Sequence, residues 1–307
     1  MKKLACVLIL AASACTIPAA AKPHHSPKPT TPSSGSATST APLVLVVMEN
    51  HRASDIMGNP SAPWMNSFAQ AGRRFTNYKE GEAGSSSLPD YLQMAAGSSC
   101  GKTTDQVVAG DRSIATAGCG TTVWNQLESV GRTWAVYQEG MPSPCYGGAT
   151  YKDLSTNGQY ALKHNPATPF PAVWDDQALC KAHVLPLSSM RPTALPDVSF
   201  ITPNICNDMH GSASTAFTNC DKGTQAIIAR GDAWLRDNVQ PLLEAGARVF
   251  VTFDESRRLY AALGGPGISP SVNATVYTHY SLLAGIEDSF GLARLNDAAN
   301  ASPLPLN

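Results

Sequence analysis

The chain has 307 residues, of which 43% are hydrophobic and 15% are charged. This length and apolar content are enough to bury a substantial core and favour one large domain over several small ones. With 22 basic and 23 acidic residues, the formal net charge is −1. Such a balance leaves no basic surface of the kind that attracts nucleic acid, so we expect no nucleic-acid partner.

The N-terminal residues are typical of an export signal. Lys2 and Lys3 precede the apolar run "LACVLILAASA", which is too short to span a bilayer as a helix. Two cleavage sites are open: after Ala21, giving a signal peptide over residues 1–21, or before Cys15, where "ASAC" is similar to a bacterial lipoprotein signal. The sequence thus predicts a secreted or cell-envelope, extracytoplasmic protein. Cys15 would be its lipid anchor, and its sole contact with a membrane, if the second site is used.

Residues 22–41 form a low-complexity segment, "KPHHSPKPTTPSSGSATSTA". Rich in Pro, Ser and Thr and almost free of large apolar side chains, it is expected to be a disordered tether. His24 and His25 lie in it, and we interpret them as solvated rather than metal-binding. The remaining residues, 42–307, are expected to form the single folded domain, and nothing in them indicates an oligomeric state.

Six cysteines remain once the signal is removed. An even number of cysteines in an oxidising compartment predicts three disulfides, and pairing each cysteine with its neighbour in the chain is the simplest connectivity. Their spacing contains no paired zinc-ligand motif, so a structural zinc site is the less favoured interpretation. The six cysteines are at positions 100, 119, 145, 180, 206 and 220.

The domain alternates short β-rich runs with helical patterns. We expect strands at 43–47, 133–137, 197–201 and 248–253, and helical segments at 62–72, 122–131, 224–246 and 279–292. Alternation of this kind predicts an α/β fold with a mainly parallel central sheet and helices on both of its faces. In open α/β sheets the ligand site lies at the carboxyl ends of the strands.

Polar and acidic residues follow each of these four strands. Carboxylates that converge at one sheet edge repel one another and raise each other's pKa unless a cation lies among them. Oxygen ligands favour calcium, magnesium or manganese, with zinc as a further candidate. Helix caps and ordinary salt bridges are the alternative. The residues at the successive strand ends are Glu49 and Asn50, then Glu139, then Asn207, Asp208 and His210, and finally Asp254 and Glu255.

Several segments resemble, in order, signature segments of one family. They are "VVMENHRASDIMGN", "SSSLPDYLQMAAGSS", "YQEGMP", "KHNP", "FITPNICNDMH", "VTFDE" and "HYSLLAGIEDSFGL". They are similar to those of the secreted phosphoesterases that join acid phosphatases to bacterial phospholipases C, within the alkaline phosphatase superfamily. The resemblance covers residues 43–292 and implies an alkaline-phosphatase-like fold in a phosphoesterase domain, 42–307. It also implies that one divalent metal ion is bound by Glu49, Asn50, Asp254 and Glu255.

The resemblance further implies a hydroxyl nucleophile just before a Leu-Pro-Asn-Tyr sequence. That place is occupied here by Ser87, in "SSLPDY". A bound cation beside the oxygen would stabilise the serine alkoxide and orient it toward phosphorus. This chain has Ser85 and Ser86 where the family commonly has His-Pro, and Asp90 in place of the asparagine. These differences bear on substrate preference. Ser85 and Ser86 are the alternative nucleophiles, and a serine-rich loop without chemistry is the alternative to a nucleophile.

Three histidines, His164, His210 and His279, correspond to polar positions of the family. As protonated imidazoles they would hold phosphate oxygens, and we favour His210 as the acid that protonates the leaving oxygen. Ordinary hydrogen-bonded histidines are the alternative, and His279 could also be a first-turn residue near a helix start. Glu139 either orients a ligand or the nucleophile, or is a plain strand-end carboxylate.

Together these features predict a metal-dependent acid phosphatase that hydrolyses small-molecule or lipid phosphate esters through a phosphoserine at Ser87. A phospholipase C is the first alternative; the chain shows no amphipathic membrane-binding stretch and lacks long extra carboxyl-terminal modules. A non-catalytic envelope protein that keeps the metal for ligand binding is the second. A serine carboxyl-ester hydrolase is disfavoured because the Gly-x-Ser-x-Gly turn is absent.

Overall fold

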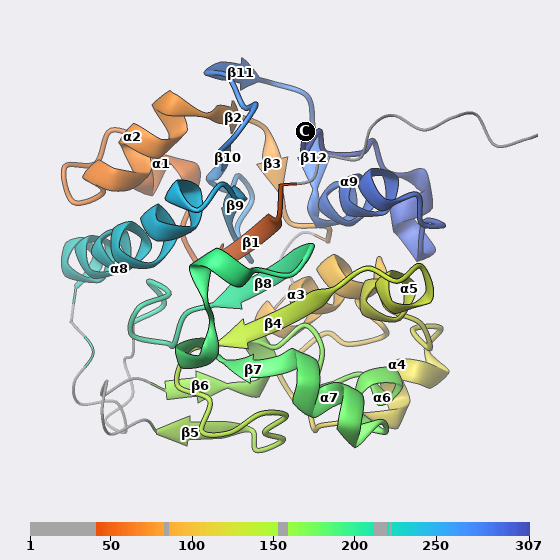
Figure 1. Ribbon diagram of the computed structural model, residues 1–307. Helices are drawn as coiled ribbons and strands as arrows, with labels where there is room; N and C mark the ends of the chain where they lie inside the picture. Colours follow the sequence, from red (N-terminus) through yellow and green to blue (C-terminus); the bar gives the residue numbers. More distant parts are fainter. Residues whose placement is uncertain (1–40, 83–85, 153–158, 212–219, 221–222) are drawn as a thin grey trace, which may run out of the picture. The chain divides into compact units, whose positions relative to one another are not determined.

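The computed structural model describes residues 41–82, 86–152, 159–211, 220 and 223–307 (Figure 1). All of these belong to one compact unit, Thr38–Asn307. The expected signal peptide with Cys15, the expected tether up to residue 40 with its two histidines, and Ser85 lie outside the described residues.

An eight-stranded sheet, in the order β11-β2-β10-β9-β1-β8-β4-β7, is the centre of this unit. The strands from β9 to β7 are mutually parallel, whereas β10 is antiparallel to both of its neighbours. The prediction of a mainly parallel sheet is therefore confirmed. The strands are β1 (Leu43–Met48), β2 (Arg73–Phe75), β4 (Trp134–Gln138), β7 (Val184–Pro186), β8 (Val198–Thr202), β9 (Arg248–Phe253), β10 (Ala261–Gly264) and β11 (Ser271–Asn273).

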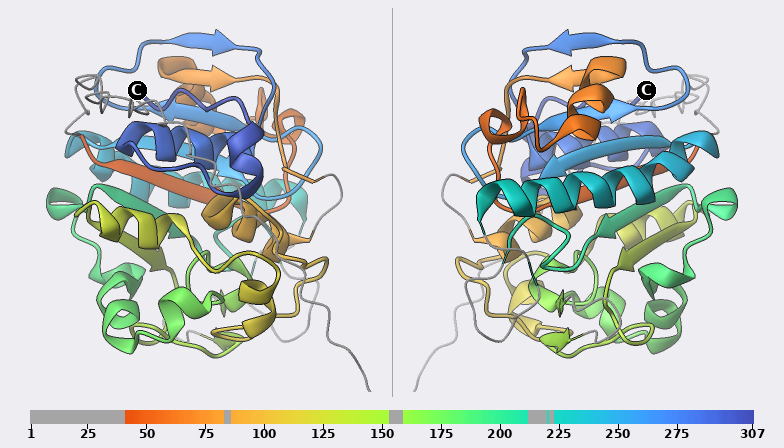
Figure 2. Two further views of the ribbon diagram at one scale, coloured as in Figure 1. Left: turned by 90° about the vertical axis from the view of Figure 1, so that its right-hand side faces the viewer. Right: turned by 90° about the vertical axis from the view of Figure 1, so that its left-hand side faces the viewer.

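The four predicted strands are β1, β4, β8 and β9, and each is buried along its whole length. Parallel strands that are covered on both faces read as continuous apolar runs rather than as alternating patterns, which is why "LVLVV" was recognisable. Helices cover both faces of the sheet, as predicted (Figure 2). On one face lie α2 (Pro63–Ala71) and α8 (Thr224–Glu244); on the other lie α3 (Ser87–Ala96), α5 (Val123–Ser129) and α9 (His279–Phe290).

Shorter elements complete the described part of the chain. Two small sheets pair β3 (Tyr78–Lys79) with β12 (Tyr277–Thr278), and β5 (Thr150–Lys152) with β6 (Gln159–Ala161). The short helices are α1 (Ala53–Ile56), α4 (Arg112–Thr116), α6 (Pro171–Trp174) and α7 (Gln177–His183). Single 3₁₀ turns are η1 (Leu162–His164), η2 (Leu187–Ser189), η3 (Pro192–Ala194) and η4 (Asn296–Asn300). No helix within the described ranges has both the length and the apolar character needed to cross a bilayer.

Within the described ranges, three disulfides join neighbouring cysteines, as the simplest connectivity predicted. They are Cys100–Cys119, Cys145–Cys180 and Cys206–Cys220. Disulfides of this number are typical of proteins that fold in an oxidising, extracytoplasmic compartment.

Asp232 of α8 caps the neighbouring helix α2. Its two carboxylate oxygens accept hydrogen bonds from the backbone N–H groups of Trp64 (3.0 Å) and Met65 (2.8 Å), in the first turn of α2. We expect Asp232→Ala to lower the free energy of unfolding by about 1–2 kcal/mol, because the N–H groups of half-buried Trp64 and buried Met65 lose their acceptor. Urea denaturation measures this. The control is Asp237→Ala on the same helix, an exposed carboxylate whose loss should change stability by less than about 0.5 kcal/mol. Equal effects of the two changes would refute the cap.

Candidate active site

Acidic side chains from three strand ends meet at one edge of the sheet. The parallel register pairs Met48 of β1 with Phe253 of β9, so the next residues, Glu49 and Asp254, leave the sheet side by side. Asp254 N donates to the Met48 carbonyl (3.0 Å) and Glu49 N donates to the carbonyl of Asp208 (2.8 Å), which follows β8. The backbone of the sheet edge thus fixes the positions of all three carboxylates.

Glu49, Asp254 and Glu255 form the first candidate metal-binding group. One carboxylate oxygen from each lies within 4.8 Å of the others. Glu49 and Asp254 are fully buried. Burial raises the pKa of Glu49, and burial together with the charge on Glu49 raises the pKa of Asp254 well above its usual value. Burial and the charge on Asp254 raise the pKa of Glu255 to about 7. Without protons or a cation, these negative charges would repel one another in a dry site.

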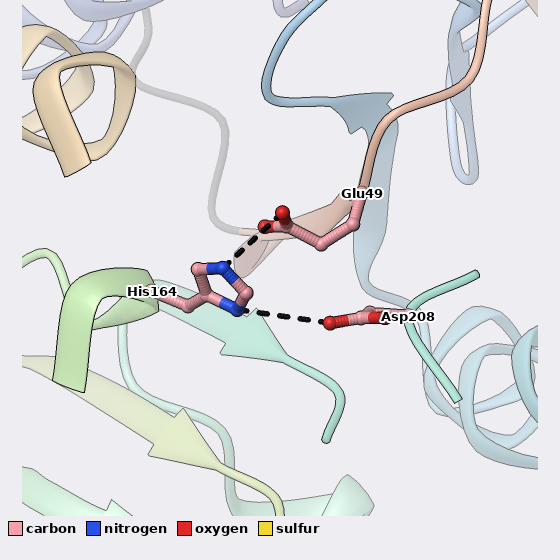
Figure 3. A group of neighbouring side chains, drawn as sticks. All are labelled: Glu49, His164 and Asp208. Atoms are coloured by element: carbon pink, nitrogen blue, oxygen red, sulfur yellow. Dashed lines mark ion pairs between the residues drawn. The ribbon is translucent and has the colours of Figure 1, made fainter. Parts of the chain in front are cut away.

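A second candidate group shares Glu49 and adds His164 and Asp208. Figure 3 shows the imidazole of His164 between the two carboxylates: Nε2 lies 3.2 Å from Glu49 Oε2, and Nδ1 lies 3.7 Å from Asp208 Oδ2. Burial lowers the pKa of His164 to about 3, whereas burial and the charge on Glu49 raise the pKa of Asp208 well above its usual value. His164 also stacks on Tyr91, with ring centroids 5.4 Å apart. The buried ring is therefore enclosed by Tyr91 and the two carboxylates.

The buried polar atoms of this edge fit a cation. Asp254 Oδ2, Asp208 Oδ2 and His164 Nε2 are buried, and none has a hydrogen-bond partner within the described residues. A buried polar atom without a partner costs free energy unless another group satisfies it. Carboxylate oxygens with one imidazole nitrogen are ligands that suit a hard divalent ion or zinc. Asp208 was noted as a strand-end residue in the sequence but was not assigned to the site.

Ser87 lies against the first group, as the first residue of α3. It is fully buried, and its Oγ is within hydrogen-bond distance of Glu49 Oε2 (3.1 Å) and Glu255 Oε1 (3.3 Å). The amino end of a helix carries partial positive charge, which favours negative charge on an oxygen placed there. Ser86 is the half-buried residue before the helix, and its side chain forms no hydrogen bond to the helix start. Of the two predicted nucleophiles within the described residues, Ser86 and Ser87, it is Ser87 whose hydroxyl lies at the acidic group.

Two further residues near Ser87, Lys163 and Asp105, were not predicted from the sequence. Lys163 of η1 places Nζ 3.4 Å from Ser87 Oγ and 2.8 Å from Asp105 Oδ2. Burial alone would lower the pKa of Lys163, but the hydrogen bond to Asp105 and the charge on Glu49 raise it above its usual value. Lys163 therefore stays cationic. It lies in the quoted segment "KHNP", beside His164, whereas nothing in the sequence pointed to Asp105.

The other two predicted histidines differ in exposure. His210 is exposed, its ring centroid lies 6.5 Å from that of His164, and its backbone N donates to Asp208 Oδ1 (2.7 Å). Its Nδ1 donates to the Gly211 carbonyl (2.6 Å). His210 thus combines solvent access with a place beside the acidic group.

His279 is fully buried at the first position of α9. Its Nε2 donates to the carbonyl of Asp254, and its Nδ1 lies 3.1 Å from the hydroxyl of Tyr78, so a neutral ring satisfies both partners. Burial lowers its pKa to about 4. No ring nitrogen is left for phosphate, and the structure matches the first-turn alternative: His279 supports the backbone that carries Asp254.

Asn50 and Glu139 both lie near the acidic groups. Asn50 has a φ of 58° and an exposed side chain, and its backbone N donates to Asp254 Oδ1 (3.1 Å). Asparagine tolerates this left-handed conformation better than most residues. Glu139 accepts hydrogen bonds from Asn204 N (2.9 Å) and from Asn207 Nδ2 (2.9 Å). Glu139 therefore holds the segment that leads to Asp208 rather than contacting Ser87.

Comparison with known proteins places this site in context. A model of the Phosphoesterase family matches residues 46–262. A phosphatidylinositol-3-phosphatase of Mycobacterium tuberculosis is 28% identical over 287 residues, which cover 89% of this chain and 86% of the relative. A phosphate-repressible acid phosphatase of Penicillium chrysogenum is 28% identical over 222 residues, covering 68% of this chain and 50% of that protein. The chain thus spans only half the length of the fungal relative.

The fold also matches a solved structure. A protein in the alkaline phosphatase superfamily from Vibrio parahaemolyticus superposes with a TM-score of 0.55 at 10% identity, over 84% of this chain and 69% of that one. At such low identity the likeness concerns the fold alone. The predicted alkaline-phosphatase-like fold is confirmed.

Proposed function

The chain belongs to the Phosphoesterase family and is a phosphoric ester hydrolase, and on that premise we propose that it is a metal-dependent acid phosphatase with Ser87 as its nucleophile. One observation carries the proposal. Ser87 Oγ lies at the amino end of α3, 3.1 Å from Glu49 and 3.3 Å from Glu255, in a buried group of carboxylates that fits a divalent ion. A serine with a purely structural role would not require a buried group of carboxylates beside its hydroxyl.

Glu49, Asp254 and Glu255 would hold one divalent metal ion, with Asn50 beside them as the fourth predicted ligand. When bound, such an ion lowers the charge of the group and stabilises negative charge on a neighbouring oxygen. His164 lies between Glu49 and Asp208, with Nε2 3.2 Å from Glu49 Oε2 and Nδ1 3.7 Å from Asp208 Oδ2, so a ring nitrogen is close to each carboxylate. Tyr91 donates to Glu49 Oε1 (2.9 Å), which fixes the carboxylate that Ser87 Oγ faces.

In the first step, the Ser87 hydroxyl passes its proton to a carboxylate oxygen and its Oγ attacks phosphorus in line with the leaving oxygen. A phosphorus–oxygen bond forms at Ser87, the bond to the leaving alcohol breaks, and the alcohol oxygen takes a proton. We assign that proton to His210, the exposed histidine beside the acidic group. Water then attacks the phosphoserine and gives a proton to His210, the phosphorus–oxygen bond to Ser87 breaks, phosphate departs, and the carboxylate returns its proton to Ser87 Oγ. Positioning and charge stabilisation supply most of the rate enhancement in such reactions.

The substrates would be phosphate monoesters, either small or on a lipid head group. The two relatives support this range, since one is named as an acid phosphatase and the other as a phosphatidylinositol-3-phosphatase. Residues 1–21 would export the protein, with residues 22–41 as a tether and Cys15 as the alternative anchor, in agreement with the three disulfides. The experiment below distinguishes this function from two alternatives. One is a phospholipase C-type phosphodiesterase, and the other is a non-catalytic metal-containing binding protein.

The test measures phosphate release from an aryl phosphate monoester between pH ~5 and ~8, a range that brackets histidine titration. We expect release that is highest on the acidic side, is lost with a chelator, and returns when a single divalent cation is added back. A phosphoserine trapped by acid quench at Ser87 would identify the covalent step. Cleavage of phosphodiesters but not of monoesters would favour the phospholipase C hypothesis. Failure on every ester, with metal still bound, would favour the binding protein.

A further inference from the structure

Half-buried Lys163 and exposed Asp105 form an ion pair whose lysine reaches the predicted nucleophile. Lys163 Nζ donates to Asp105 Oδ2 over 2.8 Å and lies 3.4 Å from Ser87 Oγ. The other carboxylate oxygen of Asp105 accepts from the backbone N–H of Leu88 (3.1 Å), the residue after Ser87. Asp105 therefore links the lysine to the helix that carries the nucleophile. An ordinary surface ion pair would not be tied to the reacting oxygen in this way.

The charge around Ser87 makes this lysine important. Two of the oxygens nearest to Ser87 Oγ belong to Glu49 and Glu255, with Asp254 behind them. A phosphate monoester carries a charge of about −1.5 to −2 at neutral pH, so these carboxylates repel it. Within the described residues, Lys163 is the one lysine or arginine whose charged group contacts Ser87 Oγ. A bound divalent ion would offset part of the carboxylate charge. Lys163, paired with Asp105, would offset a further part where it contacts Ser87 Oγ.

We propose that Lys163, held by Asp105, binds the non-bridging oxygens of the phosphoryl group at Ser87 and thereby makes the site selective for phosphate monoesters over diesters. The proposal deepens the proposed function and rests on Ser87 as the nucleophile. A group within 3.4 Å of Oγ comes next to the oxygens of any phosphorus that bonds to Oγ. A lysine ammonium offers three donors on a flexible stem and suits such oxygens as a point charge.

Selectivity follows from the number of charged oxygens. A monoester has one more unesterified, charged oxygen than a diester, so it gains more from a fixed ammonium beside the phosphoryl group. A diester places an alkoxy or aryloxy group there instead, which neither carries charge nor accepts a strong hydrogen bond. Lys163 thus stabilises the monoester in its transition state more than the diester. Asp105 is a positioning residue, because it acts on the phosphoryl group only through Lys163.

The experiment compares Lys163→Met with the wild type on an aryl phosphate monoester and on the matching bis-aryl phosphate. We expect kcat/KM for the monoester to fall about 10²–10³-fold, the loss seen when one charge-stabilising donor is removed, and that for the diester to fall less than ~10-fold. Lys163→Arg should recover part of the monoester rate. Asp105→Asn should raise KM for the monoester and raise the inhibition constant of inorganic phosphate, with a smaller change in kcat.

The chain offers a matched control. Lys102 pairs with Asp111, its side chain is exposed to a similar extent as that of Lys163 (18% against 21%), and neither member of the pair forms a hydrogen bond with Ser87. Lys102→Met should leave the ratio of monoester to diester rates unchanged. Melting temperatures of all variants separate misfolding from a local effect. Equal losses on both esters, or no loss at all, would overturn the proposal.

Failure of the proposed function is distinguishable from failure of this inference. If the wild type hydrolyses neither ester, calorimetric titration with inorganic phosphate decides the role of the lysine. Weaker phosphate binding by Lys163→Met than by Lys102→Met would support it, and unchanged binding would refute it.

Discussion

Replacing Ser87 with alanine is expected to lower kcat for an aryl phosphate monoester by at least about 10⁴-fold, the scale of loss seen when a serine hydrolase loses its nucleophile. Ser87 Oγ is the hydroxyl that faces Glu49 and Glu255, so without it the phosphoserine cannot form. Water could still attack directly, which is why some activity should remain. Steady-state phosphate release and acid-quench labelling measure the two effects.

Ser86→Ala is the matched control, since Ser86 precedes the helix and is one of the two predicted alternative nucleophiles, of which the other, Ser85, lies outside the described residues. Its side chain makes no cap hydrogen bond, and we expect its kcat to stay within about threefold of the wild type. Ser87→Ala should still be stabilised by the divalent ion, because the carboxylates are unchanged. If Ser86→Ala loses activity and Ser87→Ala keeps it, Ser86 is the nucleophile and the assignment of Ser87 is wrong.

The sequence was sufficient to predict the sheet and its acidic edge for a physical reason. Continuous apolar runs such as "LVLVV" mark parallel strands buried on both faces, and the residue after such a strand lies at a known edge of the sheet. Glu49 and Asp254 follow two strands that turned out to be neighbours, β1 and β9. Their proximity therefore required only that both strands be parallel and adjacent.

Other parts of the site were not predictable in this way. Asp208 comes six residues after β8, at the end of a loop whose path no periodicity describes. The ion pair of Lys163 and Asp105 joins the 3₁₀ turn η1 to an irregular segment, and the two residues are 58 positions apart in sequence. His279 was predicted to bind phosphate, but it is fully buried, and its ring nitrogens face the Asp254 carbonyl and the Tyr78 hydroxyl. The segment that contains His279 was recognisable from the sequence, whereas the access of its ring nitrogens depends on contacts with residues far away in the chain.

Asp254→Asn is expected to abolish activity while making the metal-free protein more stable. Asp254 is fully buried, its Oδ2 has no hydrogen-bond partner within the described residues, and burial with the charge on Glu49 raises its pKa well above the usual value. Asparagine keeps an acceptor for the Asn50 N–H and removes the charge. In a chelator at pH 7, we expect the free energy of unfolding to rise by about 1–3 kcal/mol, the scale of one unsatisfied buried group. Urea denaturation measures this change.

The difference in the free energy of unfolding between Asp254→Asn and the wild type should depend on pH. A carboxylate whose pKa is raised by folding binds more protons in the folded than in the unfolded state, so its penalty appears as pH rises above the unfolded value of about 4. The metal-free wild type should therefore lose stability between pH ~4 and ~7, with a steeper slope than Asp254→Asn. Near pH 4 the two proteins should converge. A constant difference at all pH values would show that the substitution acts by packing rather than by charge.

Added metal should make the wild type more stable than Asp254→Asn, the reverse of the order expected without metal. A ligand that binds only the folded state stabilises it by mass action, by about 2.7 kcal/mol at a concentration 100 times its dissociation constant. The wild type should gain this stabilisation, and Asp254→Asn, which lacks one carboxylate of the group, should gain little. Asp288→Asn, an exposed carboxylate on α9, should respond to the ion like the wild type. If Asp254→Asn is stabilised by the ion as much as the wild type, the ion is bound by the group of Glu49, His164 and Asp208 instead. Because both groups share Glu49, this comparison decides between them where loss of Glu49 could not.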